Sequence, residues 1–170
     1  MSRSGQILAL AAALSMTACG DGTQEQLSDS ASKPAVTAAS LGEQVVLETA
    51  DYLQQEPYLG ADLENGKRQA LVCMACHSLQ EDGPNMIGPA LHGMFGRQVG
   101  QVRGFAYSPA LQNADFIWTP TALDAWLAEP AKFLPGNFMT FIGVPKPQDR
   151  RDLIAYLLVQ THNSGQAQEN

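Results

Sequence analysis

Hydrophobic residues recur at helical spacing in three parts of the chain. The first part, residues 42–56, places an apolar stripe on one side of a helix: Val45, Val46, Thr49, Ala50 and Leu53. The second begins at Thr119, which can cap a helix whose first residue is Pro120, and should end before Pro130. The third opens at Pro147 and carries a stripe of Leu153, Ile154, Leu157 and Leu158. Because no segment alternates as a strand, the pattern predicts an all-α fold.

The first 18 residues have the features of a secretory signal peptide. Arg3 precedes a short run of apolar and small residues from Ile7 to Ala18, and a run of this length is too short to span a bilayer. The residues before Cys19, Met-Thr-Ala, resemble a bacterial lipobox, with methionine in place of the usual leucine. We therefore expect lipid attachment at Cys19. The alternative is an ordinary signal peptide with an unmodified thiol nearby.

Residues 19–41 are predicted to form a flexible linker, because Ser, Ala, Thr, Gln and Asp predominate and cannot bury a core. An additional helix is expected within residues 42–60, a folded domain over 61–162 and a disordered tail at 163–170. A lipid on Cys19 would tether this domain to a membrane on the periplasmic side of a bacterial cell.

The charge of the chain is uneven. Its formal net charge is -7, and residues 20–60 contribute seven acids against one base. The acidity therefore belongs mainly to the N-terminal arm, which we interpret as solvated and self-repelling. No segment is basic enough to indicate nucleic acid as a partner.

The chemistry of the chain is concentrated at Cys73-Met-Ala-Cys76-His77, the CxxCH pattern of haem attachment. Two thiols three residues apart on a helical turn can reach two vinyl groups of one porphyrin, and the following histidine can bind the iron. A thioredoxin-like disulfide would need a preceding strand, and structural zinc would need a second pair of ligands. Neither is present, so covalent haem c is the expected cofactor.

Several further motifs resemble those of class I cytochrome c, the mitochondrial and alphaproteobacterial type. Over residues 61–159 they occur in the family's order: Asn65-Gly66-Lys67, the CxxCH, Gly88–Arg97 (GPALHGMFGR), Trp118 through Pro130, Pro135–Met139 (PGNFM) and Arg151–Leu157 (RDLIAYL). The resemblance implies helices wrapped around one covalently bound haem c, here with an extra N-terminal helix.

The resemblance also implies roles for individual residues. His77 would be the proximal iron ligand, oriented through its other ring nitrogen by the carbonyl of Pro89. Met139 would be the sixth ligand, and a thioether opposite histidine raises the reduction potential. Gly66 and Tyr156 would form the contact between the first and last helices. Four residues match positions that bind the haem propionates: Arg97, Tyr107, Trp118 and Asn137.

These expectations describe an electron carrier rather than an enzyme. Closed coordination by His77 and Met139 would leave no iron position for a substrate. The alternative, a haem peroxidase or gas-binding sensor, would need a displaceable sixth ligand, and a fixed subunit of a larger complex would share the same chemistry. The partners expected are respiratory proteins such as a quinol–cytochrome c reductase, a terminal oxidase or a dehydrogenase.

Overall fold

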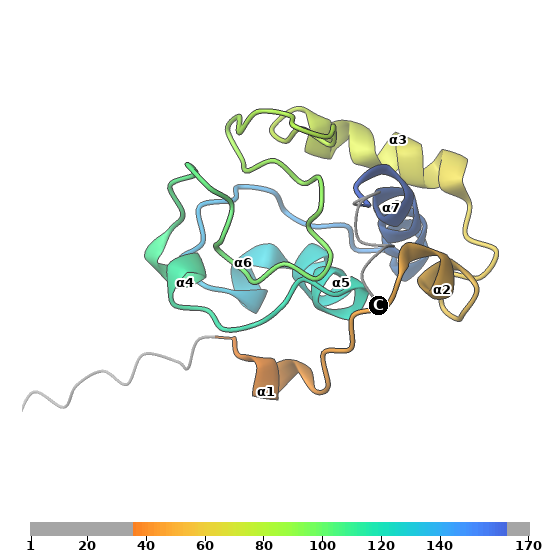
Figure 1. Ribbon diagram of the computed structural model, residues 1–170, viewed down its shortest axis with the longest axis horizontal. Helices are drawn as coiled ribbons and strands as arrows, with labels where there is room; N and C mark the ends of the chain where they lie inside the picture. Colours follow the sequence, from red (N-terminus) through yellow and green to blue (C-terminus); the bar gives the residue numbers. More distant parts are fainter. Residues whose placement is uncertain (1–35, 163–170) are drawn as a thin grey trace, which may run out of the picture. The chain divides into compact units, whose positions relative to one another are not determined.

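The computed structural model describes residues 36–162 (Figure 1). The expected signal peptide, the lipidation site at Cys19, most of the linker and the tail at 163–170 lie outside the described residues. Within residues 36–162 the structure contains helices and no strand: α1 (Ala38–Leu41), α2 (Thr49–Leu53), α3 (Leu63–Met74), α4 (Pro109–Gln112), α5 (Pro120–Ala128), α6 (Pro130–Phe133) and α7 (Pro147–Gln160). None of these described helices is long and apolar enough to cross a bilayer.

The packing of α3 on α7 is the principal helix contact, and the predicted meeting of Gly66 with Tyr156 is confirmed. A Cβ added to Gly66 would lie 2.1 Å from the carbonyl oxygen of Asp152 and 2.7 Å from Cβ of Tyr156. Only glycine therefore allows the two helices to approach this closely. This contact fixes the direction of α3, whose C-terminal end carries the CxxCH.

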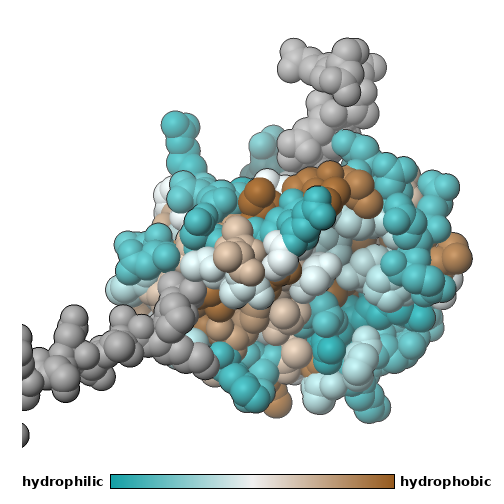
Figure 2. All heavy atoms as spheres, turned by 90° about the horizontal axis from the view of Figure 1, so that it is seen from below, coloured by the Kyte–Doolittle hydropathy of each residue, from teal (hydrophilic) through white to brown (hydrophobic). Residues whose placement is uncertain are grey.

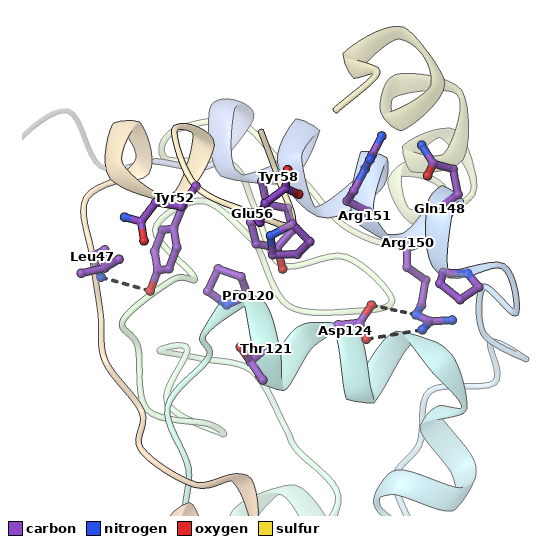
Figure 3. Close-up of a pocket in the computed structure, with 13 residues that line it drawn as sticks. Leu47, Tyr52, Glu56, Tyr58, Pro120, Thr121, Asp124, Gln148, Arg150 and Arg151 are labelled. Atoms are coloured by element: carbon purple, nitrogen blue, oxygen red, sulfur yellow. Dashed lines mark hydrogen bonds and ion pairs between the residues drawn. The ribbon is translucent and has the colours of Figure 1, made fainter. Parts of the chain in front are cut away.

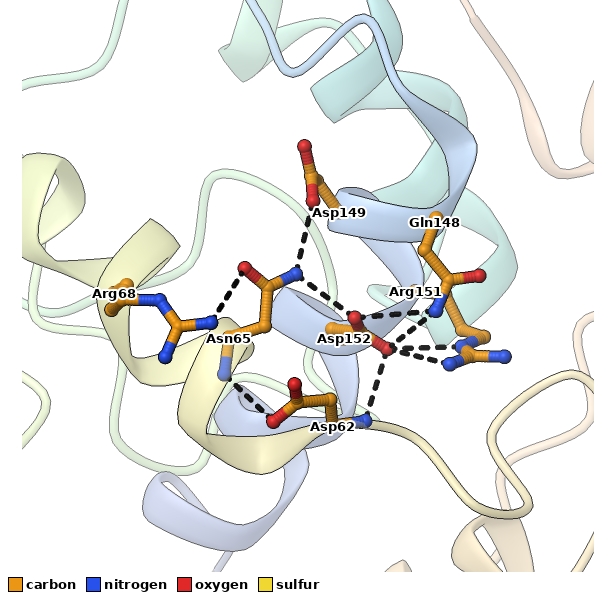
Figure 4. Close-up of polar contacts among 7 residues, drawn as sticks. All are labelled: Asp62, Asn65, Arg68, Gln148, Asp149, Arg151 and Asp152. Atoms are coloured by element: carbon orange, nitrogen blue, oxygen red, sulfur yellow. Dashed lines mark hydrogen bonds and ion pairs between the residues drawn. The ribbon is translucent and has the colours of Figure 1, made fainter.

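A polar network closes the same contact at the N-terminal end of α3 (Figure 4). The carboxylate of Asp152, 1% exposed, accepts hydrogen bonds from the backbone N–H of Asp62 (3.1 Å), Nδ2 of Asn65 (2.9 Å) and the guanidinium of Arg151 (2.8 Å). Asp62 in turn caps α3 by accepting from the backbone N–H of Asn65. One buried carboxylate thus connects the start of α3 to α7.

The helices predicted after Thr119 and from Pro147 are confirmed. Thr119 caps α5, its Oγ1 accepting a hydrogen bond from the N–H of Ala122 at 3.1 Å. The helix ends at Ala128, before Pro130. Its buried residues join the inner face of α7 and a set of edge-to-face aromatic rings that includes Phe116, Trp118, Trp126 and Phe133.

Of the helix predicted over residues 42–56, the structure forms only α2, and residues 42–48 are not helical. Two short helices, α1 and α2, flank an extended stretch that begins at Gly42, whose φ of 76° ends α1. The side-chain amide of Gln44 ties this stretch to a distant segment, because it donates to the carbonyl of Ile117 and accepts from the N–H of the same residue. The hydroxyl of Tyr52 likewise accepts from the N–H of Leu47 and donates to the carbonyl of Val45.

Candidate functional site

The largest set of predicted site residues lines one cavity of about 490 Å³. Its wall is mainly apolar and is built from the end of α3, the chain that follows it, α5, the loop before α7 and α7 itself. Eight of the nine predicted cofactor-binding residues lie there: Cys73, Cys76, His77, Pro89, Arg97, Tyr107, Trp118 and Met139. Asn137 is the exception.

The end of α3 brings the three CxxCH side chains to this cavity. The N–H groups of Cys76 and His77 both donate to the carbonyl of Cys73, at 3.0 and 2.9 Å, so the last turn of α3 continues through the motif. Cys73 and Cys76 do not form a disulfide with each other. Burial raises the pKa of Cys73. Two sulfurs on one turn beside an apolar cavity suit thioether bonds to a planar macrocycle.

His77 is held in an orientation that suits iron ligation. Its Nδ1 lies 2.7 Å from the carbonyl oxygen of Pro89, as the resemblance implied. Because a carbonyl can only accept, Nδ1 carries the proton and Nε2 keeps its lone pair free. Burial lowers the pKa of His77, although the bond to Pro89 opposes this shift. Burial thus favours the neutral imidazole, which is the form that binds a metal.

Gly88 supports His77 in a way that the sequence did not reveal. A Cβ added to Gly88 would lie 2.2 Å from Cε1 of His77, so the ring packs directly on the glycine backbone. The N–H of Gly88 also donates to the carbonyl of Cys76 at 2.8 Å. The Gly-Pro pair after the CxxCH was the available signal, because only a residue without a side chain permits this approach.

Met139 is placed at the cavity by a loop that Asn137 holds together. The Asn137 amide donates to the carbonyls of Pro130 (3.0 Å) and Leu134 (2.8 Å), and its Oδ1 accepts from the N–H of Met139 (2.9 Å). Asn137 itself does not line the cavity. The polar atoms of Asn137 bind the backbone of its own loop, and its expected role at a propionate stays a prediction.

Arg97 and Tyr107 supply polar groups to the same wall. The Arg97 guanidinium donates to the carbonyls of Ala90 and His92. Burial lowers its pKa, and the neighbouring Tyr107 opposes the shift. The Tyr107 hydroxyl accepts from the N–H of Val102 at 3.3 Å, and burial raises its pKa. Its own proton remains available for an acceptor in the cavity.

A second cavity, of about 540 Å³, lies between residues 47–58 and the first turns of α5 and α7 (Figure 3). An ion pair lines it, with Nε of Arg150 2.8 Å from Oδ1 of Asp124. Tyr58 is almost fully buried here, and its pKa is raised first by burial and then by Asp124. The residues within 36–162 that line this cavity include no Cys, His or Met, which are the ligands that haem c uses.

Comparison with known proteins identifies the family, although no protein-family model matches the chain. The cytochrome c of Gibberella zeae is 42% identical over 99 residues, which are 58% of this chain and 93% of that protein. The chain belongs to the cytochrome c family. A cytochrome c homolog of Rickettsia felis is 40% identical over 103 residues, which are 61% of this cytochrome and 59% of the homolog. The matched region therefore spans about three fifths of such homologs.

Cytochromes c bind one covalent haem c with iron and act as electron carriers. The residues of this cytochrome fit that cofactor. Cys73, Cys76, the imidazole oriented by Pro89 and the thioether of Met139 all belong to one apolar cavity. Because Gly88 has no side chain, the imidazole of His77 can pack against its backbone. These are the donor types of a His/Met-ligated haem c.

Proposed function

We propose that this protein carries single electrons on one haem c joined to Cys73 and Cys76, with His77 and Met139 as the two axial ligands. The observation that carries the proposal is the convergence of these four side chains on one apolar cavity. The bound haem would supply the one-electron couple of its iron. A neutral histidine opposite a thioether favours the reduced state and so raises the potential.

The protein's own residues would keep the iron environment similar in both oxidation states. Pro89 fixes the imidazole of His77 through a bond of 2.7 Å. Asn137 fixes the backbone of Met139 at 2.9 Å. Ligands whose positions are fixed by hydrogen bonds to the rest of the protein need little rearrangement when the charge of the iron changes. This property suits rapid electron transfer.

The polar groups of the cavity wall would serve the propionates. Tyr107 has a free hydroxyl proton, and Arg97 supplies a positive charge that the cavity buries in part. Carboxylates in an apolar site need such donors. Trp118 lines the same wall and has an indole N–H to offer. We assign these three residues to the propionates.

The test is an optical spectrum of the purified protein together with a haem-extraction assay. We expect the haem to stay with the polypeptide in acidified acetone, and carbon monoxide to bind the reduced protein slowly or not at all. Haem that extracts freely would contradict attachment to Cys73 and Cys76. Rapid binding of carbon monoxide would contradict ligation by Met139 and would favour the peroxidase or sensor function.

We further propose that the protein is periplasmic and is tethered to a membrane by lipid on Cys19. Support comes from the sequence alone: a signal-like segment, the lipobox-like residues and a polar linker. Such a tether would keep the carrier near partners such as a quinol–cytochrome c reductase, a terminal oxidase or a dehydrogenase. Cys19→Ser should move the protein from the membrane fraction to the soluble periplasm. Wild-type protein that is already soluble would contradict the anchor.

A further inference from the structure

An N-terminal segment, residues 36–47, binds the chain that leads into Trp118. We call this segment the strap. The N–H of Asp115 donates to the carbonyl of Val36 at 3.2 Å, and the carbonyl of Asp115 accepts from the N–H of Ala38. Both backbone groups of Asp115 are therefore bound to the strap, in an isolated parallel bridge.

Gln44 continues this pairing two residues further along. Its side-chain amide donates to the carbonyl of Ile117 at 2.9 Å and accepts from the N–H of the same residue at 3.0 Å. In an extended chain the backbone groups of alternate residues point to the same side, so those of Asp115 and Ile117 both face the strap. At Ile117 one side chain does what the backbone of a neighbouring strand would otherwise do.

The opposite edge of the same segment is bound to the chain that carries Arg97. The N–H of Trp118 donates to the carbonyl of Arg97, and its carbonyl accepts from the N–H of Gly96, both at 2.9 Å. Trp118 and Arg97 line the cavity that fits haem c. The segment before Trp118 therefore connects the strap on one edge to the cavity wall on the other.

The position of the strap depends mainly on hydrogen bonds. A Cβ added to Gly96 would lie 3.1 Å from Cγ1 of Val46, so the strap packs on the residue before Arg97. Val46 is nevertheless 46% exposed, and no residue of the strap is fully buried. The side of the molecule on which α1 lies in Figure 1 faces the reader in Figure 2, and hydrophobic patches there are mixed with hydrophilic residues. Since little apolar area is buried, the two bonds from Gln44 carry much of the attachment.

Resting on the function proposed above, we propose that Gln44 is a positioning residue that holds Trp118 and Arg97 at the haem propionates and thereby raises the reduction potential. Negative charge close to the iron favours the ferric state. Donors that are fixed at the propionates offset this charge, because hydrogen bonds around a metal group tune its potential. Donors on a loosened wall would offset it less, so the loss of Gln44 should lower the potential.

Gln44→Leu tests the role, because leucine is similar in size and makes neither hydrogen bond. In the reduced, haem-loaded, full-length protein, the amide of Ile117 should exchange with solvent at least about tenfold faster than in wild type. At a fixed applied potential, the ratio of reduced to oxidised protein should fall by about threefold, or about 30 mV in a one-electron couple. Gln54→Leu is the matched control, since Gln54 is exposed and donates to the carbonyl of Ala50 in α2. It should keep the wild-type potential.

Gln44→Glu offers a rescue that a general loss of stability would not show. The protonated carboxylic acid has one donor and one acceptor, as the amide has, and can pair with both backbone groups of Ile117. The ionised form has no donor and faces a carbonyl oxygen. Compared with wild type at the same pH, the potential should be lowered at about pH 8 and should approach the wild-type value as the pH falls toward about 4.

Each of three results would overturn the positioning role. The first is an unchanged rate of exchange at Ile117 in Gln44→Leu. The second is faster exchange with an unchanged potential, and the third is an equal shift in Gln54→Leu. If Gln44→Leu does not fold, Gln44→Glu decides the matter, and a wild-type potential at about pH 8 would overturn the role.

The wild-type protein separates this inference from the proposed function. A wild type without a reversible one-electron couple overturns the carrier function and the role of Gln44 together. A wild type with such a couple, whose potential Gln44→Leu shares, overturns the role of Gln44 alone.

Discussion

The backbone of Gly88 lies against the imidazole of His77 so closely that an added Cβ would sit 2.2 Å from Cε1. The next residue, Pro89, accepts the hydrogen bond from Nδ1 of the same ring at 2.7 Å. Two consecutive residues therefore control the position of His77, one through the space it leaves and the other through its carbonyl. The direction of the free Nε2 depends on both.

Replacing Gly88 with alanine should displace the ring. The methyl group cannot fit beside Cε1, so either the imidazole or the backbone must move and the bond to Pro89 must weaken. We expect Gly88→Ala to give less haem-loaded protein and to lower the free energy of unfolding by about 1–3 kcal/mol. Haem content per polypeptide and denaturant titration would measure these effects.

Gly60→Ala is the matched control. No atom lies within 4 Å of a Cβ at Gly60, but its φ of +68° imposes backbone strain on alanine. We expect a stability loss of about 1 kcal/mol with full haem content. Equal haem content in wild type and Gly88→Ala would show that the close approach is not needed.

Asn137→Asp tests the loop that carries Met139. The carboxylate keeps an acceptor for the N–H of Met139 but loses the two N–H donors, and it faces the carbonyls of Pro130 and Leu134. We expect about 2–3 kcal/mol less stability for the loop, because buried acceptors lose their partner. The oxidised protein should then bind azide more readily than wild type. Asn113→Asp, at an exposed residue, should bind azide as wild type does.

Local signals in the sequence were sufficient to predict the bounds of α5. Thr119-Pro120 and the position of Pro130 are local signals, since a cap and a missing N–H act within one turn, and α5 forms as predicted. Ser108-Pro109 is the same signal at α4, where Ser108 accepts from the N–H of Leu111. That helix was missed because one turn gives no periodicity to detect.

A helix was wrongly expected over residues 42–48 because the partner that holds this stretch lies far away in the sequence. The apolar stripe over residues 42–56 has helical spacing, but Gln44 pairs with Ile117, 73 residues away, and holds the chain extended. Asn137 was placed at a propionate by family position. Only coordinates show that its amide is already occupied by two carbonyls of its own loop. The tight approach of Gly88 to His77 also depends on the fold of the chain between them.

The stability of the α3–α7 contact should depend on pH through Asp152. Burial acts to raise the pKa of this carboxyl, but hydrogen bonds from Asn65, Arg151 and the N–H of Asp62 outweigh it and lower the pKa below its usual range. The carboxylate therefore stabilises the folded protein above about pH 4, the pKa of an unfolded aspartate. This stabilisation is lost as the pH falls through the lower pKa of the folded state.

Asp152→Asn should be less stable than wild type at pH 7 by about 2–4 kcal/mol, since Arg151 loses its buried partner. The difference between the two proteins should shrink as the pH falls from about 4 toward 2. Chemical denaturation at a series of pH values would measure it. Asp51→Asn, at an exposed position of α2, is the control. A difference that stays constant over this range would show that the charge of Asp152 contributes nothing.

Met139→Ala tests the ligand on which the carrier function depends. Alanine cannot reach the iron, so the position opposite His77 should open to water, azide or carbon monoxide. The potential should fall because the lost thioether favoured the reduced state. Losing roughly 4 kcal/mol of this preference corresponds to about 170 mV in a one-electron couple.

Met86→Ala is the control for Met139→Ala. It removes an exposed methionine that does not line the cavity and should keep the wild-type potential. Peroxidase activity should rise in Met139→Ala alone, because that reaction needs the open position. If wild type and Met139→Ala bind carbon monoxide at the same rate and share one potential, Met139 does not ligate the iron, and the enzyme or sensor function would replace the carrier.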